Sequence, residues 1–232
     1  MAFPSNGINH HNAVKSEEEL GIYTPQLKKV YSENISKIIH RGGTKYKEDN
    51  VLVFDNNKTK KVSLKLKKKG LSNGSFDYVN TSAPSKVAVS SLETYNQFRG
   101  SGNVDNYKKL TDSINSDLNL VDEKFITDFF IKNVVDKYED IDLIIIDEPN
   151  GKLYKVFPPS FSLVKNGGKL RVKPSNKPSM SRRVECVDKD GNVFDYGLRI
   201  RLHLNNGKTK WLNAKPSSLV IKFQQDRVHK LI

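Results

Sequence analysis

Residues 49–67 read DNVLVFDNNKTKKVSLKLK, and the order of residue types in this stretch decides the expected fold. Two runs with strand character, Val51–Phe54 and Lys61–Lys67, stand on either side of the turn-forming segment Asp55–Lys58. Aspartate and asparagine favour tight turns because their side chains bond the local backbone, and β-branched residues favour strands. The stretch therefore predicts an antiparallel β-hairpin.

Helical and strand patterns alternate through the rest of the first 150 residues. Thr24-Pro25 is a favourable helix start, and apolar residues at helical spacing predict a helix over Pro25–Ile39. Because Gly70–Ser91 is rich in Gly, Ser, Asn and Thr, we expect a loop there. The other elements expected in this part are helices around Val104–Ile114 and Asp122–Tyr138 and a buried strand, Leu143–Ile146.

Beyond Pro149 the pattern becomes β-rich, with Asp190-Gly191 and Asn206-Gly207 as turn signals. The expected strands are Leu153–Phe157, Lys169–Lys173, Arg182–Val187, Leu198–Leu204, Lys208–Leu212 and Leu219–Gln225. The predicted fold class is α+β. We expect a core of mixed sheet and flanking helices over 1–150, and a basic β-rich region over 151–232 packed on that core as one globular unit.

Charge is unevenly spread along the chain, which carries 39 Lys+Arg against 26 Asp+Glu, a formal net charge of +13. Residues 41–70 hold ten basic and three acidic residues, and residues 165–232 hold sixteen and five; residues 103–148 reverse the balance with five and twelve. A segregated basic surface attracts a polyanion, and counterion release supplies the affinity. The charge favours nucleic acid as the partner, with solubility or an acidic protein as the alternative.

The sequence also indicates a compartment. No apolar run approaches the ~20 residues of a membrane span, so we expect no membrane partner. The N-terminus has no secretory pattern, and the one cysteine, Cys186, fits a reducing compartment and a small core side chain. The expected location is cytoplasmic, with a homodimer left open as the oligomeric state.

The chemistry is expected in the hairpin. Ser63 and Lys65 are two apart in the second strand, so their side chains share a face, and the turn brings Asp49 close to Lys65. A carboxylate can hold Mg²⁺ (or Mn²⁺), which polarises a phosphate and lowers the pKa of a bound water, while a lysine stabilises developing negative charge. The plain alternative is that any basic β-hairpin contains an aspartate and a lysine.

The hairpin, with Gly43–Glu48 before it, resembles the PD-(D/E)xK nuclease superfamily, which includes many restriction endonucleases. The resemblance implies a restriction-endonuclease-like fold, DNA as substrate, and catalytic roles for Asp49 and Lys65. Ser63 stands where the second acid is usual, which is a departure from the pattern. Such nucleases often add a glutamate from the first helix, so Glu19 (or Glu18) is the expected further catalytic residue and metal ligand, with a solvated helix face as the alternative.

A basic strand face is expected to hold the nucleic acid. Arg199, Arg201 and His203 alternate with apolar residues and therefore share one face, which suits contact with phosphates. Gln225 closes the last strand, where its amide can read a base edge. Lys67 and Lys68 extend the basic surface at the hairpin, and the ending resembles the tails of phage-encoded restriction-like proteins, which implies a host cytoplasm.

The sequence is therefore consistent with three alternative functions. The first is a metal-dependent endonuclease that hydrolyses DNA phosphodiester bonds. The second is a nucleic-acid-binding protein without catalysis, which the serine at position 63 favours. The third is a viral structural or interaction protein whose basic faces meet an acidic partner or a packaged genome.

Overall fold

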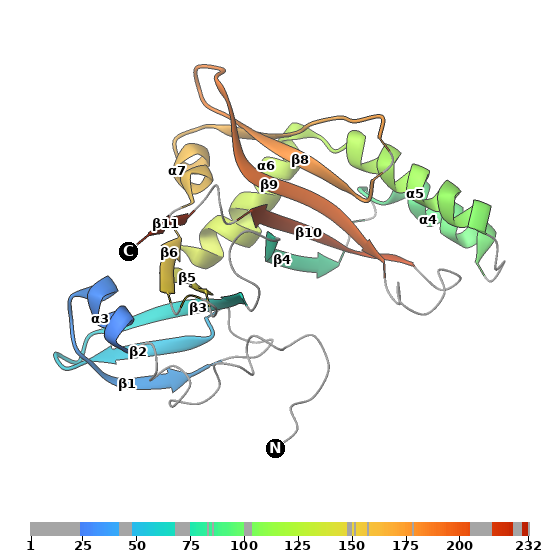
Figure 1. Ribbon diagram of the computed structural model, residues 1–232. Coiled ribbons are helices and arrows are strands. Elements are labelled where there is room, and N and C mark those ends of the chain that lie inside the picture. Colours follow the sequence, from blue (N-terminus) through green and yellow to red (C-terminus); the bar gives the residue numbers. More distant parts are fainter. Residues whose placement is uncertain are drawn as a thin grey trace. The chain divides into compact units, whose positions relative to one another are not determined.

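The computed structural model describes residues 24–41, 48–67, 75–82, 84, 86–99, 104–147, 150, 152–156, 158–177, 179–204, 215–224 and 229–231. The chain is a mixed α+β protein, as predicted; it contains two sheets and divides into two compact units (Figure 1). The first unit combines Met1–Gly74, Val135–Pro158 and Val228–Ile232, and the second combines Ser75–Val134 and Pro159–Arg227. Each unit takes segments from both sides of residue 150, where the sequence placed a domain boundary.

The first unit is built on a six-stranded sheet with the order β1-β2-β3-β5-β6-β11. Every neighbouring pair is antiparallel except β3 and β5, which run parallel. The expected hairpin is confirmed as β2 and β3, and the expected apolar strand is confirmed as β5. The strands are β1 (Ile35–His40), β2 (Asn50–Phe54), β3 (Thr59–Lys67), β5 (Ile141–Asp147), β6 (Lys152–Val156) and β11 (His229–Leu231).

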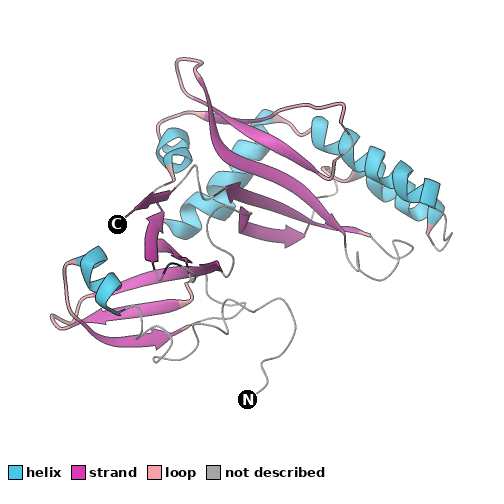
Figure 2. Cartoon of the chain, in the orientation of Figure 1, coloured by secondary structure: helices cyan, strands magenta, loops and turns pink. Residues whose placement is uncertain are grey.

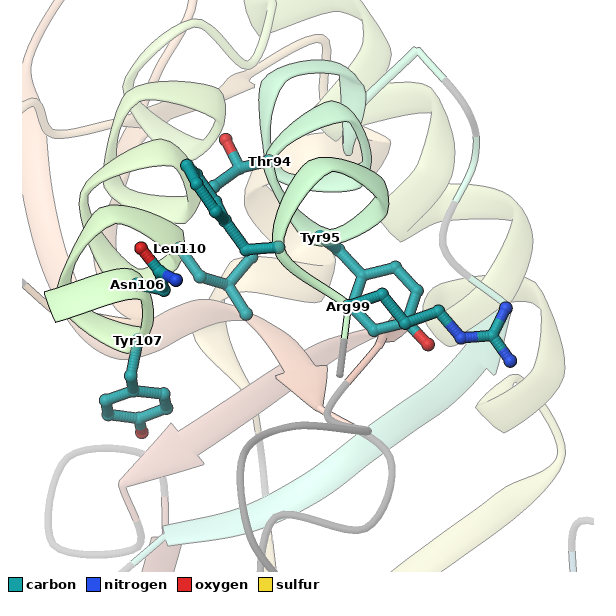
Figure 3. Close-up of a pocket in the computed structure, with 7 residues that line it drawn as sticks. Thr94, Tyr95, Arg99, Asn106, Tyr107 and Leu110 are labelled. Atoms are coloured by element: carbon teal, nitrogen blue, oxygen red, sulfur yellow. The ribbon is translucent and has the colours of Figure 1, made fainter. Parts of the chain in front are cut away.

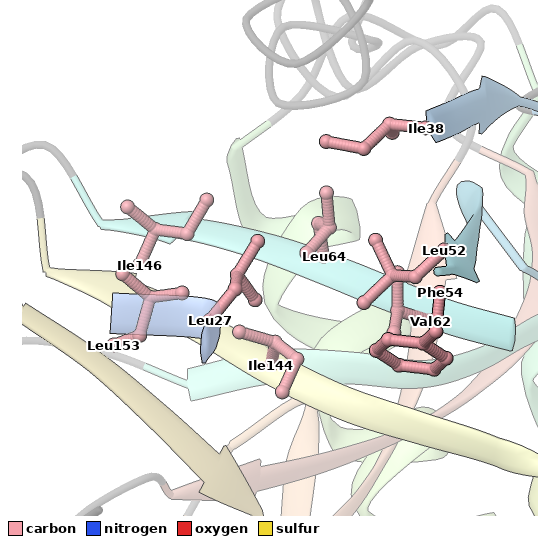
Figure 4. Packing of buried hydrophobic residues seen from close by; sticks show 9 residues of the cluster. All are labelled: Leu27, Ile38, Leu52, Phe54, Val62, Leu64, Ile144, Ile146 and Leu153. Carbon is pink, nitrogen blue, oxygen red and sulfur yellow. The ribbon is translucent and has the colours of Figure 1, made fainter. Parts of the chain in front are cut away.

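One face of this sheet forms the core of the first unit (Figure 4). Helix α3 (Thr24–Tyr31) supplies Leu27, and Tyr31 packs at the margin with its ring 5.6 Å from that of Phe54. Val62 and Leu64 of β3 lie in this core with no exposed surface. Because side chains alternate along a strand, Ser63 and Lys65 are directed to the opposite face.

The helix expected over Pro25–Ile39 is wrong in its second half. The helix ends at Tyr31, Ser32 adopts a φ of 55°, and the chain turns back as β1. A non-glycine residue in the left-handed region does not continue a helix, so Ser32 marks the break. The isoleucines after it are β-branched, and pairing with β2, Ile38 opposite Leu52, holds them as a strand.

The second unit is built on a five-stranded antiparallel sheet with the order β4-β10-β9-β8-β7 (Figure 2). The strands are β4 (Ser75–Ser82), β7 (Lys169–Val172), β8 (Ser181–Val187), β9 (Val193–Leu204) and β10 (Pro216–Gln224). They confirm most of the expected C-terminal strands, whereas the expected strand Lys208–Leu212 lies outside the described residues.

The loop expected over Gly70–Ser91 is also wrong, because it contains β4 and the start of a helix. Ser, Asn and Asp have low strand propensity, but β4 pairs with β10 from Ser75 to Ser82. Its Tyr78 is buried and stacks on Phe223 of β10 with ring centroids 4.2 Å apart. Tertiary packing therefore overrides the local composition.

Helices cover the buried face of the second sheet. Tyr78 and Phe223 share an aromatic cluster with Phe130 and Phe161 from two of these helices. No helix of the described residues is long and apolar enough to cross a membrane. The helices are α4 (Val89–Phe98), α5 (Val104–Asn119), α6 (Glu123–Phe130) and α7 (Pro159–Lys165), and α6 continues into a π-helical turn, Ile131–Val135, and a 3₁₀ turn, Asp136–Tyr138.

The helix expected over Asp122–Tyr138 is therefore real in its first half and irregular in its second. Asp122 begins it as an N-cap, accepting a hydrogen bond from the Phe125 amide at 2.8 Å. The π-helical turn then changes the helix register before the chain reaches β5. Tyr138, at the end of the 3₁₀ turn, lies just before the start of β5 and is buried.

Candidate functional site

Asp49 and Ser63 meet inside the first unit. The Asp49 backbone enters the sheet, donating to the Val62 carbonyl at 2.9 Å. Its carboxylate then accepts two hydrogen bonds at Oδ2, from Ser63 Oγ at 3.1 Å and from the Leu64 amide at 2.5 Å. Asp49 is 2% exposed and Ser63 is 1% exposed. The hairpin thus brings together two of the residues that the sequence selected, in a buried, hydrogen-bonded contact.

Lys65 lies on the same side of the sheet as this pair. It follows Ser63 by two residues in β3, and the core residues Val62 and Leu64 occupy the other face. Lys65 is half-buried and pairs in register with Ile145 of β5. An ammonium group on this face favours anionic groups near the Asp49–Ser63 pair.

Tyr138 is a site residue that the sequence reasoning missed. It is buried before β5, and its phenol lies near Ser63 and Asp49. Burial raises the pKa of the Tyr138 hydroxyl most, the influence of the nearby Ser63 side chain lowers it, and the charge of Asp49 raises it again. The hydroxyl is therefore protonated at neutral pH. Its sequence signal was only an aromatic residue at the end of an expected helix, which does not distinguish a site from a core.

The donors near Asp49 are oxygen atoms, which suits a hard cation. A carboxylate such as that of Asp49 is a ligand type that Mg²⁺ accepts, with water completing its shell, whereas a hydroxyl and a protonated phenol are weak ligands. The described part of the chain holds no group of three or more His, Cys, Asp or Glu side chains placed to bind one metal ion. Glu19, the expected further ligand, lies outside the described residues, as does Glu18.

Asp147 is a second buried carboxylate on this face of the sheet. It is 1% exposed, and its Oδ2 accepts a hydrogen bond from Asn150 Nδ2 at 2.8 Å. It pairs with Lys67, whereas Ser63 pairs with Leu143, four residues earlier on β5. Four residues of strand span about 13 Å, so Asp147 and Asp49 do not share one ion. Asp147 therefore does not take the place of the second acidic residue, which is usual at the position of Ser63.

The expected nucleic-acid-binding residues are partly described. In β9 Leu198, Ile200 and Leu202 are buried, and Arg199 and Arg201 between them are half-buried on the opposite face, which confirms the expected alternation. The Lys67 backbone belongs to β3, but its side chain, Lys68 and Gln225 lie outside the described residues.

Comparisons of the chain with protein-family models, with curated proteins and with solved structures find no match.

A pocket between α4 and α5 is too small to be a substrate site (Figure 3). It is lined by Tyr95, Phe98, Tyr107 and Leu110 among others, and its volume is about 10 Å³. That volume holds about one water molecule. The two helices are instead joined by Asp117 of α5, whose carboxylate oxygens accept from the amides of Ser90 and Ser91 at 2.9 and 2.8 Å.

Proposed function

We propose that this chain is a DNA-binding, Mg²⁺-dependent endonuclease with its site at Asp49, Ser63 and Lys65. The observation that carries the proposal is the contact between Asp49 and Ser63, 3.1 Å from Oδ2 to Oγ, with Lys65 on the same face of the sheet. These are the positions of the PD-(D/E)xK pattern that the sequence resembles. The mixed sheet with parallel β3 and β5 provides the rigid support that such a site needs.

Each residue has a distinct role in the proposed reaction. When bound, Mg²⁺ supplies a Lewis acid for the phosphate and lowers the pKa of water. Asp49 and Glu19 would hold the ion, and Ser63 and the Leu64 amide orient the Asp49 carboxylate. Lys65 stabilises the negative charge that develops on the phosphate oxygens.

DNA affinity is assigned to the second unit. Arg199 and Arg201 project from one face of β9, next to β8 with Arg183 opposite Arg199. Arginine contacts to phosphate are strong because the guanidinium can donate two parallel hydrogen bonds. Such contacts position a duplex without reading its sequence.

One feature of the Asp49–Ser63 contact favours a second function, which is DNA binding without cleavage. The Asp49 carboxylate is buried, and its Oδ2 already accepts from Ser63 and from the Leu64 amide. A carboxylate in this state can serve structure alone, by fixing the start of β2 to β3. The chain would then bind DNA without cutting it.

A cleavage assay separates the two functions. Purified protein is incubated with supercoiled plasmid and Mg²⁺ or Mn²⁺, and a parallel sample contains EDTA. The proposal expects cleavage that requires the metal and is lost in Asp49→Asn and in Lys65→Ala. Asp49→Asn is chosen because its amide oxygen can still accept from Ser63 and Leu64, so the variant removes the charge and keeps the fold.

Asp55→Ala is the matched control. Asp55 is exposed in the turn of the same hairpin, and its substitution is expected to leave cleavage unchanged. Circular dichroism of each variant checks that the fold is retained. Cleavage that persists in folded Asp49→Asn places the active site elsewhere, and a wild type that binds DNA but never cuts it establishes the non-catalytic function.

A further inference from the structure

A concave basic pocket lies beside the segment that joins β7 to β8. Its volume is about 400 Å³, within the range of about 300–1,000 Å³ that ligand sites usually have. Its charged lining residues are all cationic: Lys173, Lys177, Arg182, Arg183 and Arg199. The remaining lining residues are serines and a proline. A hollow with this lining suits an anion with several acceptor oxygens.

Arg182 is the buried member of this set and holds the wall of the pocket in place. It is 2% exposed, and all three guanidinium nitrogens donate hydrogen bonds. The acceptors are Asn119 Oδ1 at 2.6 Å and the carbonyls of Ser181, Ser175, Ser179 and Asn115 at 2.9, 3.1, 3.2 and 3.5 Å. Arg182 therefore ties the end of α5 to the segment that forms the rim.

All of these acceptors are neutral, so the charge of Arg182 is not cancelled by its hydrogen bonds. Burying a cation without an anionic partner costs free energy, and desolvation accordingly lowers the pKa of Arg182. Carbonyl dipoles satisfy the donors but leave the full positive charge near the pocket. That field favours a negative ligand at the surface of the pocket.

The other cations are only partly neutralised within the protein. Lys173 forms an ion pair with Glu185 at 3.0 Å, and Arg183 forms one with Asp195 at 3.2 Å. Two carboxylates thus face five cations. Within the described ranges, neither Lys177 nor Arg199 has an acidic partner.

Arg201 adds an unused donor beside the pocket. It lies opposite Ser181, a lining residue, in the pairing of β8 with β9. Its Nε is buried and has no hydrogen-bond partner among the residues that the structure describes. A buried donor without an acceptor costs free energy, and a ligand oxygen would remove that cost.

We propose that this pocket is a phosphate seat that receives a backbone phosphodiester group of bound DNA, with Lys177 and Arg199 as its contacts. The inference rests on DNA binding from the proposed function but not on the hydrolytic site. The phosphate oxygens would accept from these two side chains, and Arg182 would act as a positioning residue. Free inorganic phosphate has the same chemistry, so the test includes it.

The test measures binding of a fluorescein-labelled 20-base-pair duplex by anisotropy across a salt series, in EDTA so that no cleavage occurs. The variants are Lys177→Ala and Arg199→Gln, which both change side chains outside the core. One lost phosphate contact lowers the slope of log K against log salt by about 0.9, which is about a fivefold loss of affinity at 0.15 M salt. Each variant is expected to show that change.

Lys189→Ala is the matched control, because Lys189 is an exposed lysine in the turn after the opposite end of β8. It is expected to keep the wild-type slope. If Lys177→Ala and Arg199→Gln bind DNA with the wild-type slope, the phosphate seat is wrong although DNA binding stands. If the wild type does not bind DNA at all, the proposed function fails with it.

A competition arm identifies the source of the phosphate. Sodium phosphate and sodium chloride are compared at equal sodium concentration as competitors of the duplex. Because free phosphate presents the same oxygens as a backbone phosphodiester, the phosphate seat predicts extra displacement by sodium phosphate in the wild type, and this excess is lost in Lys177→Ala. If the excess is lost in Lys177→Ala while the salt slope of that variant keeps the wild-type value, the pocket takes free phosphate only and the DNA contact is wrong.

Discussion

Three of the nine buried polar side chains in the part of the chain that the structure describes accept hydrogen bonds from backbone amides. Asp49 accepts from the Leu64 amide, Asp117 from the Ser90 and Ser91 amides, and Thr127 Oγ1 from the Leu170 amide at 2.9 Å. An unpaired amide in the interior is costly, so these residues are required by the chain segments that they join. For Asp49 this structural function coincides with the proposed catalytic role.

Asp117→Ala is expected to destabilise the protein by about 1–3 kcal/mol, because two amides at the start of α4 lose their acceptor. The substitution also removes a negative charge that interacts favourably with the positive, N-terminal end of the α4 dipole. Asp112→Ala is the control, because Asp112 is at an exposed position of α5, the helix that carries Asp117. It is expected to change the free energy of unfolding by less than about 0.5 kcal/mol. Urea unfolding followed by circular dichroism measures both, and equal midpoints would contradict the capping role.

At the scale of the elements, helices end at glycines and at residues with a left-handed backbone conformation. Helix α7 ends where the amides of Gly167 and Gly168 donate to the carbonyls of Val164 and Leu163 at 3.2 and 3.0 Å. Gly167 has a φ of 84°, so this is a Schellman ending. It turns the chain directly into β7, the edge strand that leads to the basic pocket.

Gly168→Ala is expected to cost about 3 kcal/mol of stability, because the added Cβ would lie 2.8 Å from the Leu163 carbonyl oxygen, a backbone atom. Gly191→Ala is the comparison. Gly191 also lies in a turn of the second unit, with a φ of +86°, but an added Cβ meets nothing within 4 Å. Its cost is therefore the conformational one alone, about 1 kcal/mol. Thermal unfolding ranks the two, and a reversed order would refute the steric argument.

At the scale of the whole molecule, the charge of +13 acts through where it is placed. Arg199 and Arg201 share a strand face with the basic pocket beside it, whereas Lys108 and Lys109 are exposed on α5 in the acidic middle of the sequence. Long-range attraction draws DNA toward any basic protein, but close contacts decide the affinity.

Double charge reversal tests this placement. Arg199→Glu with Arg201→Glu is expected to weaken duplex binding by at least tenfold at 0.15 M salt, because two phosphate contacts become repulsive. Lys108→Glu with Lys109→Glu changes the net charge equally and is expected to weaken it by less than about threefold. Anisotropy titrations compare the two variants. Equal losses would show that net charge, and not the β9 face, controls binding.

Local pattern predicted those parts of the fold that depend on neighbours in sequence. The hairpin of β2 and β3 follows from a turn segment between two strand-like runs, and β5 follows from an unbroken apolar run. The alternation around Arg199 predicted its face correctly, and Cys186 is a buried core thiol whose pKa burial raises to about 12. These signals survive because turn chemistry and side-chain alternation act over a few residues.

Tertiary structure alone decided the rest. Ile35–His40 could continue a helix or form a strand by its own pattern, and pairing with β2 chose the strand. The largely polar β4 is a strand because β10 pairs with it and Phe223 stacks on Tyr78. Tyr138 reaches Ser63, and Arg182 reaches Asn119, across 75 and 63 residues of chain. Contacts between distant segments depend on how complete elements pack, and no local spacing of residue types encodes that packing.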